Sequence, residues 1–262
     1  MNSWEIFDDW GLEKKSVNNS NVLNWSDFDV LNKSFNTIIE AQYKELIPLI
    51  EQWDSLTIDL GKDATHKNWS NFRPLNLSRE EDWSNWLAFL IEHSESGMFS
   101  YYLLNEKEGK NPKKVHRELS CGNYRADIVI NWEGNNYTHI EVKIGDENLL
   151  KTFNTCLTLE DKFSNTNWKH YILLLSNQVN SWNQVSFFQS KHISLITWED
   201  VSIALRKSIL GEESITWKVW AYSFIGVIEQ KLIGFNGHLL NDKPKENLEV
   251  KLNILKQGLK HE

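Results

Sequence analysis

The chain has 262 residues, of which 40% are hydrophobic and 24% charged, an ordinary composition for a globular protein that can bury a sizeable core. A net charge of −8 argues against a protein that coats nucleic acid, although metal-binding carboxylates in an enzyme also make the sum negative. No apolar run is as long as a membrane span, and the acidic N-terminus lacks an apolar signal core. Cys121 and Cys156 are too few for a disulfide scaffold and are not spaced as metal ligands. We therefore expect a cytoplasmic protein without a membrane partner.

Apolar residues recur with a helical period over residues 26–53, with Ser26 or Asp27 as the N-cap. Pro48 is expected to kink or interrupt this helix. The polar stretch DLGKDATHKNWSNFRPLN follows and predicts a loop. We expect an N-terminal helical appendage, residues 1–70, to end within that loop.

A second helix is predicted in LSREEDWSNWLAFLIEHS, where Ser78 and Glu81 have the spacing of a capping box. Its apolar residues form one helical stripe that runs from Trp83 to Ile91. Polar NEKEGKNPKK, residues 105–114, predicts a loop with a basic cluster.

The segment YRADIVINWEGNNYTHIEVKIG, residues 124–145, predicts a β-hairpin that turns at EGNN. Strand alternation places Arg125, Asp127 and Val129 on one face of the first arm, and Ala126, Ile128 and Ile130 on the other. In the second arm, His139, Glu141 and Lys143 share a face opposite Ile140, Val142 and Ile144. A turn near Gly134 sets Asp127 opposite Val142, within one residue, so Asp127 and Glu141 become cross-strand or diagonal neighbours. The charged side chains are therefore expected to converge.

The remaining elements predict an α/β protein with a central mixed sheet flanked by helices on both faces. DENLLKTFNTCLTLEDKF is predicted to be a helix, WKHYILLLS a buried strand, SWNQVSFF a short helix and HISLIT a strand. Amphipathic helices follow in ITWEDVSIALRKSI, in TWKVWAYSFIGVIEQKLIGF and over residues 246–260. We expect residues 71–210 to form the main domain, and residues 211–262 to be a C-terminal helical extension packed on it.

Two carboxylates on adjoining strands are a hard-oxygen ligand set suited to Mg²⁺, for which Mn²⁺ can substitute. Asp127, Glu141 and the backbone carbonyl of Val142 would bind the ion. Such an ion lowers the pKa of a bound water and stabilises the charge that develops on a phosphodiester. Lys143, two residues after Glu141 on the same face, would position that water or contact the phosphate.

This pattern resembles the core of the PD-(D/E)XK nuclease superfamily, with Asp127 in the first motif strand and E-V-K at 141–143 in the second. The resemblance spans residues 78–200 and implies a restriction-endonuclease-like core and a metal-dependent nuclease. It also implies that an acid of the preceding helix binds metal, which maps onto Glu81, with Glu80 as a weaker alternative, and that Lys151 in the following helix contacts a phosphate. Ala126 stands where the family name has Pro, and the superfamily includes members that have lost activity.

Each candidate residue also has a structural interpretation. Asp127 and Glu141 would be merely solvated if the hairpin were half exposed, with Lys143 as an ion partner. Arg125 would bind phosphate or form a salt bridge with an acid such as Glu118. His139 would line the cleft or be structural. Lys151 would contact a phosphate or be an ordinary exposed lysine of its helix.

The favoured hypothesis is a Mg²⁺-dependent nuclease, with DNA favoured over RNA as its substrate but the choice left open, in a bacterial restriction or anti-phage context that rests on the resemblance alone. The terminal helices would serve a homodimer or a protein partner. One alternative is an inactive module of the same fold that binds a protein or nucleic acid. Another is an acidic interaction protein that uses Trp-rich surfaces, since the chain has 13 Trp residues.

Overall fold

The structure is a computed structural model that describes residues 25–69, 77–107, 109–145, 149–183, 193–235 and 248–260. The chain divides into two compact units, residues 1–41 and 42–262. In the first unit, the described residues 25–41 form the beginning of α1 (Trp25–Leu56), where Leu31, Phe35 and Ile38 are exposed. Helix α1 continues through Pro48 without interruption, and Ser26 and Asp27, which were expected to cap it, lie inside the helix instead.

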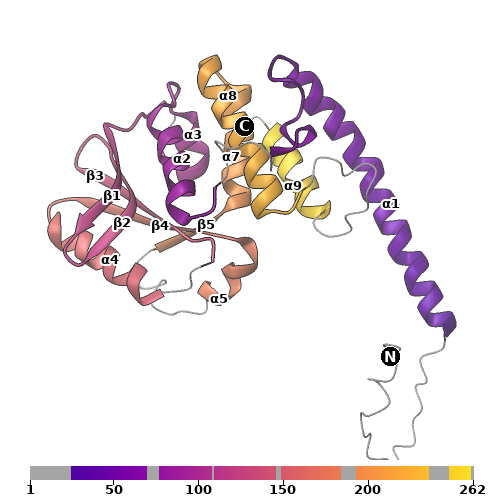
Figure 1. Ribbon diagram of the computed structural model, residues 1–262, viewed down its shortest axis with the longest axis horizontal. Helices are drawn as coiled ribbons and strands as arrows, with labels where there is room; N and C mark the ends of the chain where they lie inside the picture. The colour runs from indigo at the N-terminus through magenta and orange to yellow at the C-terminus, as the bar shows by residue number, and fades with distance from the viewer. Residues whose placement is uncertain are drawn as a thin grey trace, which may run out of the picture. The chain divides into compact units, whose positions relative to one another are not determined.

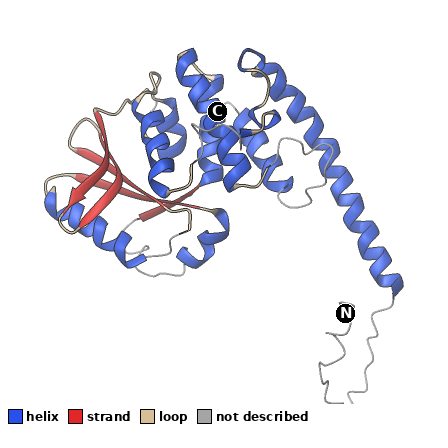
Figure 2. Ribbon diagram, viewed as in Figure 1, coloured by secondary structure: helices blue, strands red, loops and turns tan. Residues whose placement is uncertain are grey.

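A five-stranded mixed sheet forms the centre of the second unit (Figures 1 and 2). The strands follow one another in sequence order: β1 (Lys114–Cys121), β2 (Tyr124–Asn131), β3 (Asn136–Val142), β4 (Asn167–Leu174) and β5 (Ile193–Thr197). The pairs β1–β2 and β2–β3 are antiparallel, whereas β3–β4 and β4–β5 are parallel. The expected α/β class with a central mixed sheet is thus confirmed.

The β2–β3 hairpin turns where the sequence predicted it. Gly134 and Asn135 both have positive φ, 73° and 55°, which is the backbone conformation that Gly and Asn tolerate best. Ile128 pairs with Ile140, one residue away from the expected register and within its margin. Because the side-chain period of a strand is two residues, this register decides which side chains of the two arms share a face.

Helices cover both faces of the sheet (Figure 2). Helices α4 (Leu149–Lys162) and α5 (Val179–Asn183) lie on one face, where Leu159 and Trp182 are buried. The opposite face carries α2 (Glu80–Glu92), α3 (Met98–Leu104), α7 (Trp198–Leu210), α8 (Ile215–Val227) and α9 (Leu248–Leu259). The remaining helical elements among the described residues are short: η1 (Ile58–Leu60), η2 (Ala64–His66), η5 (Ser176–Gln178) and the π-helical turn η6 (Ile228–Leu232). None of the described helices has both the length and the apolar character needed to cross a membrane.

The larger hydrophobic core joins the second half of α1 to the sheet and to the C-terminal helices. Trp53 of α1, Leu87 of α2, Ile140 of β3, Phe224 of α8 and Leu255 of α9 all belong to it. The C-terminal helices therefore pack on the sheet domain, and their inward faces belong to this core. The alternation expected for β2 holds for the Ile128 and Ile130 pair, but Ala126 packs with Val129 on the α4 side.

The described part of the stretch predicted to be a loop after α1, residues 59–69, contributes Ala64 and Trp69 to this core, and its residues 70–76 lie outside the described residues. Its residue Asp63 is buried and pairs with the guanidinium of Arg206 in α7, with Nη1 2.7 Å from Oδ2. Glu229 of η6 pairs with the same guanidinium, with Nε 2.8 Å from Oε1. The guanidinium lies 4.6 Å from the ring of Trp53, and buried Lys251 of α9 donates to Thr65 beside Asp63. A linker between domains would not carry such a buried ion cluster.

Candidate active site

The β2–β3 register brings the two predicted acids together. Continuing the observed pairs by one residue sets Asp127 directly opposite Glu141. Oδ2 of Asp127 accepts a hydrogen bond of 2.9 Å from the backbone N–H of Val142, whose own side chain is buried in the larger core. Glu141 and Lys143, the neighbours of Val142 in the chain, consequently face the other side of the strand, toward α4.

Glu141 and Lys143 form a buried ion pair, with Nζ 3.1 Å from Oε1 and each side chain only 1% exposed. Burial alone would raise the pKa of Glu141, but His139 and Lys143 beside it outweigh burial and lower that pKa. Burial likewise would lower the pKa of Lys143, but the charges of Glu141 and Glu80 raise it overall. Both groups are therefore ionised near neutral pH.

The raised pKa of Asp127 reflects its burial and the negative charge of Glu141 beside it. Burial, and then the charge of Glu141, raise the pKa of Asp127 to about 7, although its hydrogen bond from Val142 acts in the opposite direction. Both carboxylate oxygens of Glu141 are buried, and none of the described residues donates a well-aligned hydrogen bond to them, the approach of Lys143 being an ion pair. Neighbouring carboxylate oxygens with few hydrogen-bond donors are suitable ligands for a hard divalent cation such as Mg²⁺.

Helix α2 adds a third acid to the site, and it is Glu80 rather than Glu81. The carboxylate of Glu80 accepts a 2.8 Å hydrogen bond from the backbone N–H of Ile144, and its other oxygen lies 3.9 Å from Nζ of Lys143. Glu81 points instead to Arg125, with Nη2 2.8 Å from Oε1, and its side chain is about half exposed at 48%. The helix starts at Glu80, because Asp82 accepts hydrogen bonds from the backbone N–H groups of Ser78 and Arg79, so Asp82 and not Glu81 has the capping role.

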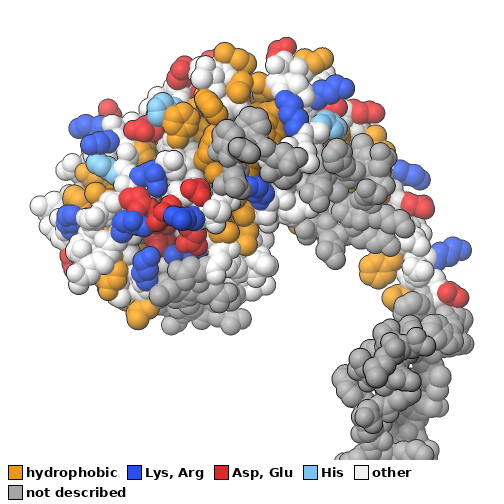
Figure 3. All heavy atoms as spheres, in the orientation of Figure 1, with side chains coloured by type: hydrophobic (Ala, Val, Ile, Leu, Met, Phe, Trp, Pro, Cys, Tyr) orange, Lys and Arg blue, Asp and Glu red, His pale blue; other side chains and the backbone are white. Residues whose placement is uncertain are grey.

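Arg125 lies at the rim of the acids and bridges two of them. Its second nitrogen, Nη1, lies 2.6 Å from Oε2 of Glu118, so the salt-bridge alternative for Arg125 is observed. Glu118 sits in the middle of β1 at the level of Asp127 with a φ of 54°, a conformation that a glutamate in a strand rarely adopts. Acidic and basic side chains gather next to one another beside α2, over the sheet (Figure 3). The rim is thus a mixed-charge surface.

The other predicted substrate contacts lie in different environments. His139 is fully buried, with Nε2 3.4 Å from Oε2 of Glu141, so it does not face a substrate. Lys151 is exposed in the first turn of α4, where a phosphate contact and an ordinary surface lysine both fit. Two hollows lined by described residues lie away from the acids. A cavity of about 470 Å³ lies at the opposite end of β3 and β4, around Trp132 and Trp168, and an apolar one lies between α2 and α8.

Sequence reasoning missed a group of three side chains whose types could hold a metal ion. Cys156 of α4 and His170 of β4 lie next to His139, and all three are buried. Linear spacing gives no signal for this group, because the three residues meet only through the parallel register of β3 and β4 and the packing of α4. The one signal in the sequence is that the two strands predicted to be buried each carry a histidine, His139 and His170.

Comparison of the chain with protein-family models, with curated proteins and with solved structures returned no match. The fold and the site therefore define an α/β protein with a five-stranded mixed sheet and a cluster of three acids and one lysine.

Proposed function

We propose that the chain is a divalent-metal-dependent nuclease that hydrolyses phosphodiester bonds in DNA. The observation that supports this proposal is the convergence of Asp127, Glu141, Glu80 and Lys143 at one end of the β2–β3 hairpin. The same residues carry the resemblance to the PD-(D/E)XK nucleases, with Glu80 now replacing Glu81. We extend the proposal to a restriction-endonuclease-like sheet core and to Mg²⁺ as the ion, with Mn²⁺ as a substitute.

The acids of this chain would hold the ion, and the lysine would act on the phosphate. Asp127, Glu141, Glu80 and the Val142 carbonyl are the oxygen donors, and the ion supplies Lewis-acid stabilisation of the phosphodiester when bound. Lys143 keeps its charge next to the acids, so its ammonium stabilises negative charge that develops on the phosphate. Arg125 and Lys151 would position the nucleic-acid backbone at the rim.

The proposed biological setting, a bacterial restriction or anti-phage system in the cytoplasm, rests only on the resemblance. A homodimer would allow both strands of a duplex to be cut. The exposed apolar residues of α1 and α8, among them Phe35 and Trp220, are the described surfaces that would serve such an interface.

A cleavage assay tests the proposal directly. The purified full chain is incubated with plasmid DNA or short RNA in Mg²⁺, Mn²⁺ or EDTA, alongside Asp127→Asn, Lys143→Met and the exposed-acid control Asp59→Asn. We expect metal-dependent cutting of DNA that is lost in the first two variants and kept in the control. Cutting that persists in Asp127→Asn and Lys143→Met would belong to a contaminant.

The second candidate, a binding module that no longer cuts, is favoured by one observation. Glu141 and Lys143 are each only 1% exposed, which leaves little surface through which a substrate could reach them. For this candidate, fluorescence anisotropy would show DNA binding that is equal in EDTA and Mg²⁺, without cleavage in either. An active nuclease would instead gain affinity or activity from the metal.

A further inference from the structure

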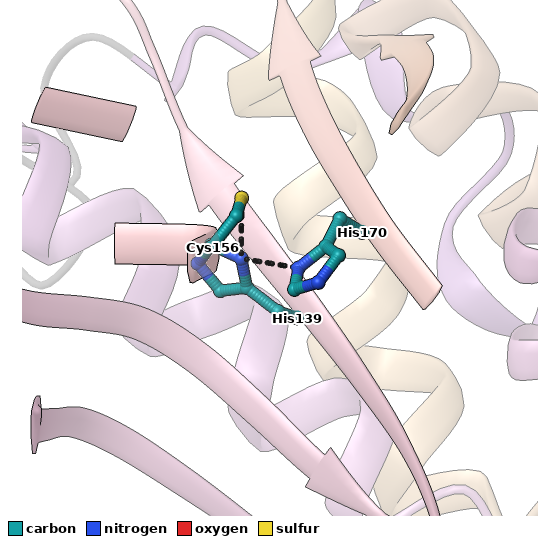
Figure 4. A group of neighbouring side chains, drawn as sticks. All are labelled: His139, Cys156 and His170. Carbon is teal, nitrogen blue, oxygen red and sulfur yellow. Dashed lines mark hydrogen bonds between the residues drawn. The ribbon is translucent and has the colours of Figure 1, made fainter. Parts of the chain in front are cut away.

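Three metal-binding side chains meet inside the unit formed by β3, α4 and β4. His139 and His170 are partners in the parallel ladder of β3 and β4, and Cys156 comes from α4, which connects the two strands. Nδ1 of His139 lies 3.2 Å from Nδ1 of His170 and 3.7 Å from Sγ of Cys156 (Figure 4). One ligand atom from each of the three lies within 4.8 Å of the others. One sulfur and two ring nitrogens, from three different elements, therefore lie close together.

Two of these three separations match the edges of a tetrahedral zinc site. Zn–N bonds of about 2.0–2.1 Å and Zn–S bonds of about 2.3 Å place two nitrogens about 3.3 Å apart and a nitrogen and a sulfur about 3.6 Å apart. The observed 3.2 Å and 3.7 Å differ from those values by about 0.1 Å each. The third separation, between Cys156 and His170, is within 4.8 Å, so a local movement of these side chains would close the site around an ion.

The outer nitrogens of both rings face carboxylates. Nε2 of His139 lies 3.4 Å from Oε2 of Glu141, and Nε2 of His170 lies 3.3 Å from Oε1 of Glu160. A carboxylate next to Nε2 favours the tautomer with its proton on that nitrogen, which leaves the lone pair on Nδ1. At 3.2 Å the two Nδ1 atoms either share a proton in a hydrogen bond or, with both protons on Nε2, can share a cation. Carboxylate–histidine pairs of this kind surround many zinc ions in proteins.

We propose that His139, Cys156 and His170 bind one Zn²⁺ ion, with a water molecule as the fourth ligand. A thiolate and two imidazoles select zinc over Mg²⁺, so this site is chemically distinct from the oxygen-rich site around Asp127. The zinc ion would fasten α4 to the two central strands. It would also fix Glu141, whose Oε2 faces His139 while Oε1 faces Lys143.

Metal content tests the proposal without reference to nuclease activity. The full chain, without a histidine tag and without exposure to chelators, is analysed by inductively coupled plasma mass spectrometry. We expect about one zinc ion per chain in the wild type and none in Cys156→Val or His170→Asn. Cys121→Val is the matched control, because Cys121 is the other buried cysteine on the α4 side of the sheet and should leave the zinc content unchanged.

Cobalt binding by the wild-type chain tests the same proposal if the variants fail to fold. Wild-type protein that has been stripped with a chelator is titrated with Co²⁺ while circular dichroism monitors its fold. A sulfur-to-cobalt charge-transfer band together with tetrahedral d–d absorption supports the proposal, and both should persist in Asp127→Asn, a variant that removes the proposed nuclease site only. A folded wild-type chain that binds neither zinc nor cobalt through a thiolate would overturn it, as would equal loss of zinc in Cys121→Val.

Discussion

The ammonium of Lys143 lies 3.1 Å from Oε1 of Glu141, and each of these side chains is 1% exposed. Removing one partner of a buried pair leaves an uncompensated charge, which typically destabilises a protein by about 3–5 kcal/mol. We therefore expect Lys143→Met to lose stability as well as the proposed cleavage. Urea unfolding at neutral pH measures the change. The double variant Glu141→Gln with Lys143→Met should regain much of the lost stability, since neither charge remains. If the double variant instead lost as much stability as the two single variants added together, the pair would not be coupled.

Glu80 and Glu81 are adjacent in α2 but lie in different surroundings, and this makes them a matched pair of variants. Glu80 is next to Lys143 and the Ile144 amide, whereas Glu81 is paired with Arg125. We expect Glu80→Gln to weaken the Mn²⁺-induced thermal shift and to reduce cleavage at least about tenfold, which corresponds to about 1.4 kcal/mol. Glu81→Gln should change both by far less. Equal effects of the two substitutions would contradict the assignment of Glu80 to the site.

The buried ion cluster around Arg206 predicts how stability depends on pH. Burial would raise the pKa of Asp63, but the charge and hydrogen bond of Arg206 outweigh it and hold this pKa far below its usual range. As the pH falls below about 4, the unfolded chain takes up a proton at Asp63 before the folded chain does, so the stabilisation present at neutral pH is lost.

Replacing Asp63 tests this pH dependence. Asp63→Asn should cost about 3–5 kcal/mol at neutral pH, because Arg206 loses one of its two anionic partners. The difference from the wild type should shrink when urea unfolding is repeated below about pH 4. Asp59→Asn, on the exposed side of η1, serves as the control. A difference that stays constant across this range would contradict the lowered pKa.

Gly226 of α8 is a position where alanine does not fit. A Cβ atom there would lie 1.9 Å from Nε1 of Trp69, and that nitrogen donates a 2.7 Å hydrogen bond to the carbonyl of Ala64. We expect Gly226→Ala to destabilise the protein by about 1–3 kcal/mol or more, although Ala normally favours a helix over Gly. The melting temperature measures the loss. Gly211→Ala is the control, since its Cβ would only touch the carbonyl of Ser208 at an ordinary 3.4 Å.

Much of the fold could be predicted because the pattern of apolar residues sets it locally. The alternation Ile140, Val142 and Ile144 identified a strand with one face in the core, and the stripe beginning at Trp83 identified α2. The choice between Glu80 and Glu81 could not be made in this way. Adjacent helical residues point about 100° apart, so their directions depend on where the helix starts and how it is placed on the sheet.

Long-range pairing accounts for the rest of what the sequence did not reveal. Asp63 lies in a polar stretch that predicts a loop, and its burial depends on Arg206, which is 143 residues away. The meeting of His139 and His170 similarly depends on a parallel register that no local pattern specifies. Such contacts are set by tertiary packing, which a single sequence does not display.

The guanidinium of Arg206 ties together segments from widely separated parts of the chain, and this limits how the protein can be shortened. A fragment that ends near residue 210 would keep Arg206 but lack both Glu229 and Lys251. A fragment that begins near residue 71 would lack Asp63 and the Trp53 ring that lies beside the guanidinium. Neither truncation keeps the buried ion cluster intact, so we expect both fragments to be less stable than the chain from Gln42 onward.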